Sequence, residues 1–88
     1  MRPTLEITYR NGKPLAAYLY TGRHADRVAA RSEAHGVFVA DFDAAGDLIG
    51  VEIPTPTPGS SESLLKLLSS LHVQNVTPHD LAPLNTAA

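Results

Sequence analysis

The residues best placed to do chemistry are the acids between positions 41 and 52. Asp41, Asp43, Gly46 and Glu52 match positions 1, 3, 6 and 12 of an EF-hand calcium loop. Ala45 stands at position 5 and supplies no side-chain oxygen, and the flanking residues alternate as strands where an EF-hand has helices. A hairpin turn explains Asp43 and Gly46 without a metal, because Asp bonds turn amides and Gly accepts positive φ. We therefore treat both as structural turn residues.

Other side chains that could take part in catalysis or metal binding are scattered along the chain. The histidines show no i,i+3 or i,i+4 spacing that would form a local metal pair, and they stand at positions 24, 35, 72 and 79. The serines at positions 60, 61 and 63 do not form a Gly-x-Ser-x-Gly elbow, and serines at a helix start are usually caps. The sequence therefore predicts no catalytic residue, no cofactor and no metal site.

Length and composition indicate one small globular domain. The chain has 88 residues, of which 43% are hydrophobic, and it has no cysteine. A domain of this size buries only about 60–65% of the surface that its unfolded chain exposes, so oligomerisation often completes its core. The absence of cysteine fits a reducing compartment. The first residues lack an apolar leader and no run is long enough to span a membrane, so we expect a cytoplasmic protein without a membrane partner.

Charge is divided unevenly along the chain. Residues 1–31 hold six basic and two acidic residues, and residues 32–88 hold one basic and seven acidic residues, which gives +4 and −6 and a net charge of −2. The two halves could attract each other within one domain or across a dimer. The alternative is a nucleic-acid face, with Tyr18 and Tyr20 stacking on bases beside the cations Arg10, Lys13, Arg27 and Arg31. The net negative charge opposes an approach to phosphate, so we expect nucleic acid not to bind.

Alternation of apolar and polar residues predicts a sheet in the first 53 residues. Strands are expected over 4–9 and 15–21, joined by Asn11-Gly12, a dipeptide typical of two-residue hairpins. A less regular strand is expected over 27–33, with helix as the alternative, followed by a turn at Ala34-His35-Gly36. The last hairpin pairs 37–42 with 48–53, and Gly50 there indicates a bulge or a close backbone approach.

A proline-rich linker over 54–60 separates this sheet from an amphipathic helix over 61–71. Ser60 or Ser61 is expected to cap the helix, and leucines spaced i, i+3, i+4 and i+7 form its apolar stripe. The domain is therefore expected to span 1–76. Residues 77–88 form a tail in which Thr77-Pro78 can begin a short helical turn that Pro83 ends.

These elements predict an α+β fold. We expect an antiparallel β-meander of four to five strands, with one C-terminal amphipathic helix packed on one face. Sequential strand order is expected because every connection is short. The other face then carries either Tyr18 and Tyr20 or the side chains that alternate with them, and it is a candidate interface, since a contiguous apolar patch on a small domain usually marks one. We therefore expect a non-catalytic homo-oligomerising or protein-interaction module, with a dimer favoured and any protein partner unspecified.

The turn Asp41-Phe42-Asp43-Ala44-Ala45-Gly46 is followed by Ile49-Gly50-Val51-Glu52-Ile53. This motif is the most specific part of a resemblance, over roughly residues 4–54, to the YuzE-like family of small bacterial proteins, a domain of unknown function. It implies a small antiparallel sheet with a C-terminal helix. It implies no activity and no catalytic residue. The chain departs from the family after Tyr9, where Arg10-Asn11-Gly12-Lys13-Pro14 replaces an acidic stretch.

Overall fold

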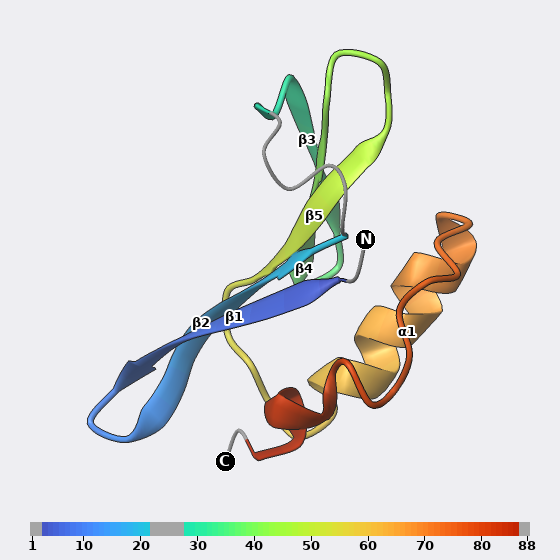
Figure 1. Ribbon diagram of the computed structural model, residues 1–88. Coiled ribbons are helices and arrows are strands. Elements are labelled where there is room, and N and C mark those ends of the chain that lie inside the picture. The colour runs from blue at the N-terminus through green and yellow to red at the C-terminus, as the bar shows by residue number, and fades with distance from the viewer. Residues whose placement is uncertain (1–2, 22–27, 87–88) are drawn as a thin grey trace.

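The computed structural model describes residues 3–21 and 28–86, which form one sheet with helical segments on one of its faces (Figure 1). Five antiparallel strands are present in these residues: β1 (Thr4–Arg10), β2 (Lys13–Tyr20), β3 (Arg31–His35), β4 (Phe38–Phe42) and β5 (Leu48–Ile53). The helix α1 spans Ser60–Ser70, and a short 3-10 helix η1 spans Ala82–Thr86. The predicted α+β fold with an antiparallel sheet is confirmed.

The order of strands across the sheet is β1-β2-β5-β4-β3, so the expected sequential order is wrong after β2. The β3–β4–β5 segment folds as a meander, and its last strand returns to pair with β2. Burial explains this arrangement, since β5 (LIGVEI) is mostly buried and takes the central position. The strand β3 (RSEAH) has no fully buried residue and therefore lies at the edge.

The β1–β2 hairpin forms at the dipeptide that the sequence singles out. Asn11 has a φ of 55° and Gly12 a φ of 77°, which a two-residue turn of this kind requires. Thr8 pairs with Ala16 but Tyr9 pairs with Pro14, so β2 carries one extra residue at this point. The strand β1 itself has no extra residue. Its C-terminal half, toward the hairpin turn, extends past the helix α1 (Figure 1).

The third strand begins and ends later than expected. It runs from Arg31 to His35 instead of over 27–33, and the turn centres on Gly36 with a φ of 61°. Glycine takes this conformation without steric cost, so the chain turns there and the strand continues through His35. Arg27 and the polar connection expected over 22–26 lie outside the described residues.

The β4–β5 turn is held by the side chain of Asp43. Its Oδ1 accepts hydrogen bonds from the amides of Ala45 and Asp47, both at 3.0 Å, and the side chain is buried. Gly46 has a φ of 88° and donates its amide to the carbonyl of Asp43. The turn therefore has the geometry that the sequence predicts from these two residues.

Replacing Asp43 with alanine should lower the free energy of unfolding by about 2–3 kcal/mol, because two turn amides lose their acceptor in a buried place. Asp47→Ala is the matched control, since Asp47 takes part in these bonds through its backbone and should change stability by about 0.5 kcal/mol or less. Urea unfolding of both variants measures the difference. Equal stability of the two variants would contradict this role for Asp43.

The start of α1 differs from the expected serine cap. Gly59 is the N-cap residue and makes no side-chain cap bond. The hydroxyl of Ser60 instead accepts the amide of Thr57 at 2.7 Å, and Ser61 donates to the side chain of Asn85 at 2.6 Å. Both serines therefore tie the helix to neighbouring segments. The partner of Ser60 is Thr57 of the linker, and the partner of Ser61 is Asn85 of the tail.

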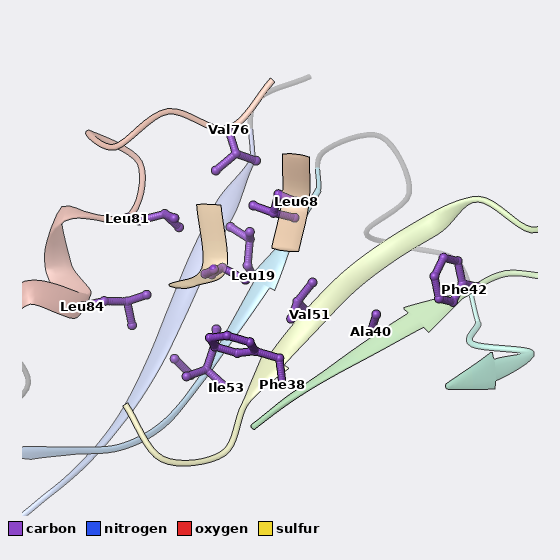
Figure 2. Close-up of a cluster of buried hydrophobic side chains, with 12 residues drawn as sticks. Leu19, Phe38, Ala40, Phe42, Val51, Ile53, Leu68, Val76, Leu81 and Leu84 are labelled. Carbon is purple, nitrogen blue, oxygen red and sulfur yellow. The ribbon is translucent and has the colours of Figure 1, made fainter. Parts of the chain in front are cut away.

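The core lies between the sheet and the helical segments. The side chains of β2, β4 and β5 that face α1 are buried, and Leu64 and Leu68 of the predicted leucine stripe meet them. Figure 2 shows the tail residues Leu81 and Leu84 pointing into the same cluster. Both leucines are fully buried, so the tail belongs to the core and the folded unit extends past the expected boundary at residue 76.

A small hydrogen-bonded box begins the tail. The amide of Thr77 donates to Oδ2 of Asp80 at 2.8 Å, and the amide of Asp80 donates to the hydroxyl of Thr77. This reciprocal bonding satisfies amides at the start of the turn. The expectation that Pro83 ends the helical turn is wrong, because η1 begins at Ala82 and includes Pro83. A proline near the start of a helix loses no hydrogen bond.

Candidate functional site

The face of the sheet opposite α1 carries a polar network that joins three strands. The hydroxyl of Tyr18 on β2 donates to Oδ2 of Asp41 on β4 at 2.7 Å. Ser32 on β3 donates to Oδ1 of the same carboxylate at 2.6 Å. Asp41 therefore accepts a bond at each oxygen, and it links the edge strand β3 to β2 across the width of the sheet.

Gly50 makes this contact sterically feasible. It lies on β5 between Tyr20 of β2 and Asp41 of β4, and the ring of Tyr18 crosses the sheet over it. A Cβ built on Gly50 would lie 2.4 Å from Cε1 of Tyr18. The sequence indicated a bulge or a close approach at Gly50. The close approach is present there, and the β4–β5 register shifts beside it, where Ile49 is the extra residue.

Tyr18 and Tyr20 form a pair on this face. Their ring centroids lie 4.7 Å apart, and both side chains are half-buried. Partial burial raises the pKa of Tyr18 well above its ordinary value, and the hydrogen bond to Asp41 and the nearby negative charges add to this effect. The charge of Glu6 and its hydrogen bond raise the pKa of Tyr20. Both tyrosines are therefore surrounded by acids.

The raised pKa of Tyr18 predicts that the fold weakens at alkaline pH. The ordinary pKa of tyrosine is 10.0, so above that pH the unfolded chain releases a proton that folded Tyr18 still holds. The free energy of unfolding should be unaffected by this group below pH 10 and should fall as pH rises further. Tyr18→Phe should reduce that fall. Urea unfolding at about pH 8 and about pH 11 measures it, and an unchanged pH dependence in Tyr18→Phe would contradict the assignment.

Edge strand β3 carries a set of local ion pairs. Arg31 contacts Glu33 at 3.0 Å, and Glu33 contacts His35 at 3.2 Å. These two neighbours lower the pKa of Glu33, with the hydrogen bond from His35 as the largest cause. The guanidinium of Arg31 also lies 4.4 Å from the centre of the Phe42 ring. Charged side chains of this kind protect a sheet edge against another strand.

Edge strand β1 also carries two charged residues, Glu6 and Arg10, but no ion pair joins them to a neighbour among the described residues. Its seven residues are exposed or half-buried, it contains no proline, and the extra residue of the adjacent bulge belongs to β2. Within the part of the chain that the structure describes, β1 pairs with β2 alone. The backbone amides and carbonyls on the outer side of β1 therefore pair with no other strand among the described residues.

The two charged halves of the chain do not neutralise each other through ion pairs in the described residues. Arg10 and Lys13 stand opposite each other at the end of the β1–β2 hairpin, and neither makes an ion pair with a residue in 3–21 or 28–86. The one pair that joins an early cation to a later acid there is the local contact of Arg31 with Glu33. Attraction between the two halves, within one domain or across a dimer, therefore stays a prediction.

The residues expected to form a nucleic-acid face are not brought together. Tyr18 and Tyr20 lie among Glu6, Asp41 and Glu52, three carboxylates on the same face of the sheet. The cations Arg10 and Lys13 lie at the hairpin end, Arg31 packs over Phe42 on the far edge strand, and Arg27 is outside the described residues. A phosphate beside the tyrosines would meet negative charge.

Asp41 and Asp43, the first two positions of the calcium-like pattern, have separate roles. Asp41 binds Tyr18 and Ser32 on the sheet face, whereas Asp43 bonds the amides of its own turn. No group of three or more potential metal ligands occurs among residues 3–21 and 28–86. A groove of about 630 Å³ lies beside this turn, lined in part by Asp47, His72 and Asn75.

Sequence reasoning identified the two tyrosines as candidate interface residues but missed the hydrogen bond from Tyr18 to Asp41. Whether Tyr18 and Tyr20 touch another molecule stays a prediction. The signal that could have revealed the network was Gly50, since a glycine in an apolar central strand leaves room for a ring from a neighbouring strand. Ser32 carries no comparable sequence signal.

Comparisons with protein-family models, curated proteins and solved structures find no match to this chain. The resemblance to the YuzE-like family therefore stays a prediction. Within the described residues, no helix is long and apolar enough to cross a membrane.

Proposed function

We propose that the protein is a non-catalytic module that acts by associating with a second copy of itself as a dimer. The observation that carries the proposal is the seven-residue edge of β1, which pairs on one side alone among the described residues. An unprotected edge of this length readily accepts another strand. A second copy is the simplest source of one, because it brings an identical edge and a closed two-fold arrangement.

The thin core supports the same proposal. One face of the sheet packs against α1 and the tail, and a small domain of this kind gains stability when a partner buries more of its surface. The charges point the same way, because Arg10 makes no ion pair with another residue that the structure describes. An opposite charge on a second copy would supply a partner for it.

We further propose that the protein works in the cytoplasm. A chain without cysteine has no disulfide that the reducing conditions there could break. Membership of the YuzE-like family is proposed on the motif over 41–53. The five-stranded antiparallel sheet followed by α1 agrees with the architecture that the resemblance implies.

Light scattering after size-exclusion chromatography tests the association. Samples from about 1 μM to about 1 mM cover association free energies of about −8 to −4 kcal/mol. We expect the mass to rise from that of one chain to that of two and to stop there. One chain at every concentration would contradict the proposal, and growth beyond two copies would contradict a closed dimer.

A further inference from the structure

We propose that the two copies join by antiparallel pairing of their β1 strands, with Thr8 of one copy opposite Thr8 of the other at the two-fold axis. This inference rests on the proposed self-association and specifies its surface and register. The sheet would then run continuously through both copies. The opposite edge, β3, stays outside the interface because its Arg31–Glu33 and His35–Glu33 pairs protect it.

The charges of β1 select this register. When Thr8 lies opposite its counterpart, Glu6 of each copy lies opposite Arg10 of the other, and this contact occurs twice. The two residues lie on the same face of β1, because side chains alternate and the strand has no extra residue. Opposite charges that face each other across two strands stabilise the pairing. The edge of β1 is therefore complementary to itself.

A register shifted by one residue fits less well. With Ile7 at the axis, Glu6 would lie opposite Thr8, and the two Glu6 side chains would become diagonal neighbours on one face. Like charges at that distance repel each other. The Thr8 register keeps the two Glu6 residues apart and gives each of them a cation.

The apolar side chains of β1 also gain partners in the Thr8 register. Ile7 of one copy lies opposite Tyr9 of the other, on the face of the sheet that carries α1. The side chain of Tyr9 is 56% exposed in the single chain. An aromatic ring beside a β-branched residue is a favourable cross-strand pair. Pairing would therefore cover an exposed ring as well as an exposed backbone.

Stacking of the two open sheet faces is the competing arrangement, and charge disfavours it. Each face presents the carboxylates of Glu6, Asp41 and Glu52. Bringing the two faces together would oppose six acids, while the cations Arg10 and Lys13 of each face lie at its hairpin end. Tyr18 also has its hydroxyl bound to Asp41 within its own chain. The edge therefore offers the better self-complementary surface.

Charge exchange tests the proposal. Glu6→Arg and Arg10→Glu should each weaken the dimer by about tenfold or more, because each change creates two like-charge contacts. An equimolar mixture of the two variants should recover association, because all charges in the mixed dimer are again opposite. Lys13→Glu is the matched control for Arg10→Glu, since it changes the net charge equally but lies on β2. Circular dichroism checks that each variant is folded.

Cysteine cross-linking fixes the register, because the chain has no cysteine of its own. Thr8→Cys should form a disulfide-linked dimer under mild oxidation, since directly opposed residues lie within reach. Thr4→Cys should not, because the two sites would be about 27 Å apart. Faster cross-linking of Ile7→Cys than of Thr8→Cys would overturn the register.

The outcomes separate this inference from the proposed function. A wild-type protein that stays a single chain at all concentrations contradicts both. A dimer that the Glu6 and Arg10 variants leave intact overturns pairing through β1 while self-association stands. Loss of the dimer in both variants with recovery in their mixture supports both.

Discussion

Leu84→Ala is expected to lower the free energy of unfolding by about 2–5 kcal/mol, the range for truncating a fully buried leucine. Leu84 is completely buried although it lies in the short helix η1 near the end of the described chain. Figure 2 shows its side chain directed into the cluster that also holds Ile53 and Phe38. Removing it leaves a cavity that the proline-containing segment around it is poorly able to fill.

Leu15→Ala is the matched control for this prediction. Leu15 is the same residue type, but it is 50% exposed at the bulge of the β1–β2 hairpin. Its truncation should cost about 1 kcal/mol or less. Urea unfolding of both variants gives the comparison, provided that the slope of the free energy with urea concentration is unchanged. A similar cost for both leucines would contradict the assignment of the tail to the core.

Gly50→Ala is expected to destabilise the fold by about 3 kcal/mol, the upper end of the usual cost of overpacking. The new Cβ would lie 2.4 Å from Cε1 of Tyr18 and 2.5 Å from the carbonyl oxygen of Leu19. The ring can move only by giving up its hydrogen bond to Asp41. The carbonyl belongs to the backbone of β2, so it can move only if the pairing of β2 with β5 is disturbed.

Gly59→Ala provides the control for Gly50→Ala. A Cβ at Gly59 meets nothing within 4 Å, and its φ of −88° is open to any residue. Its cost should be about 1 kcal/mol or less, the effect of a weaker N-cap. Thermal or urea unfolding measures both variants, and near-ultraviolet circular dichroism reports the tyrosine environment. Retention of both stability and the tyrosine signal in Gly50→Ala would contradict the close packing over this glycine.

Local geometry explains why much of the fold could be predicted from the sequence. The turns at Asn11-Gly12 and at Gly46 each need positive φ, which these residue types accept. The alternation in β4 separates buried Phe38, Ala40 and Phe42 from the opposite face. The leucines of α1 likewise recur with the period of an α-helix, so they lie on one of its faces. Each of these signals is contained in a few neighbouring residues.

Long-range pairing explains what the sequence analysis got wrong or missed. The choice of β5 as the neighbour of β2 depends on which strand best tolerates burial on both sides, and short connections do not determine it. The core positions of Leu81 and Leu84 come from a segment with prolines and no extended period. The sequence signal in this segment was the helix cap at Thr77, and a cap does not indicate what the segment packs against.

The polar network depends on the same long-range pairing. Tyr18 reaches Asp41 because the strand between them is β5, which has Gly50 at the crossing point. In sequential order the intervening strand would be β3 (RSEAH), which contains no glycine. The position of β1 at an edge is common to both orders, so the edge used in the proposed pairing does not depend on which order the strands take.

Hydrogen exchange of the β1 amides as a function of protein concentration tests the central claim most directly. If β1 strands pair between copies, exchange over Thr4–Arg10 should slow as the dimer forms, and exchange over Arg31–His35 at the other edge should not change. Exchange in β1 that is equally fast at all concentrations, including those at which the mass corresponds to two chains, would contradict pairing through this strand.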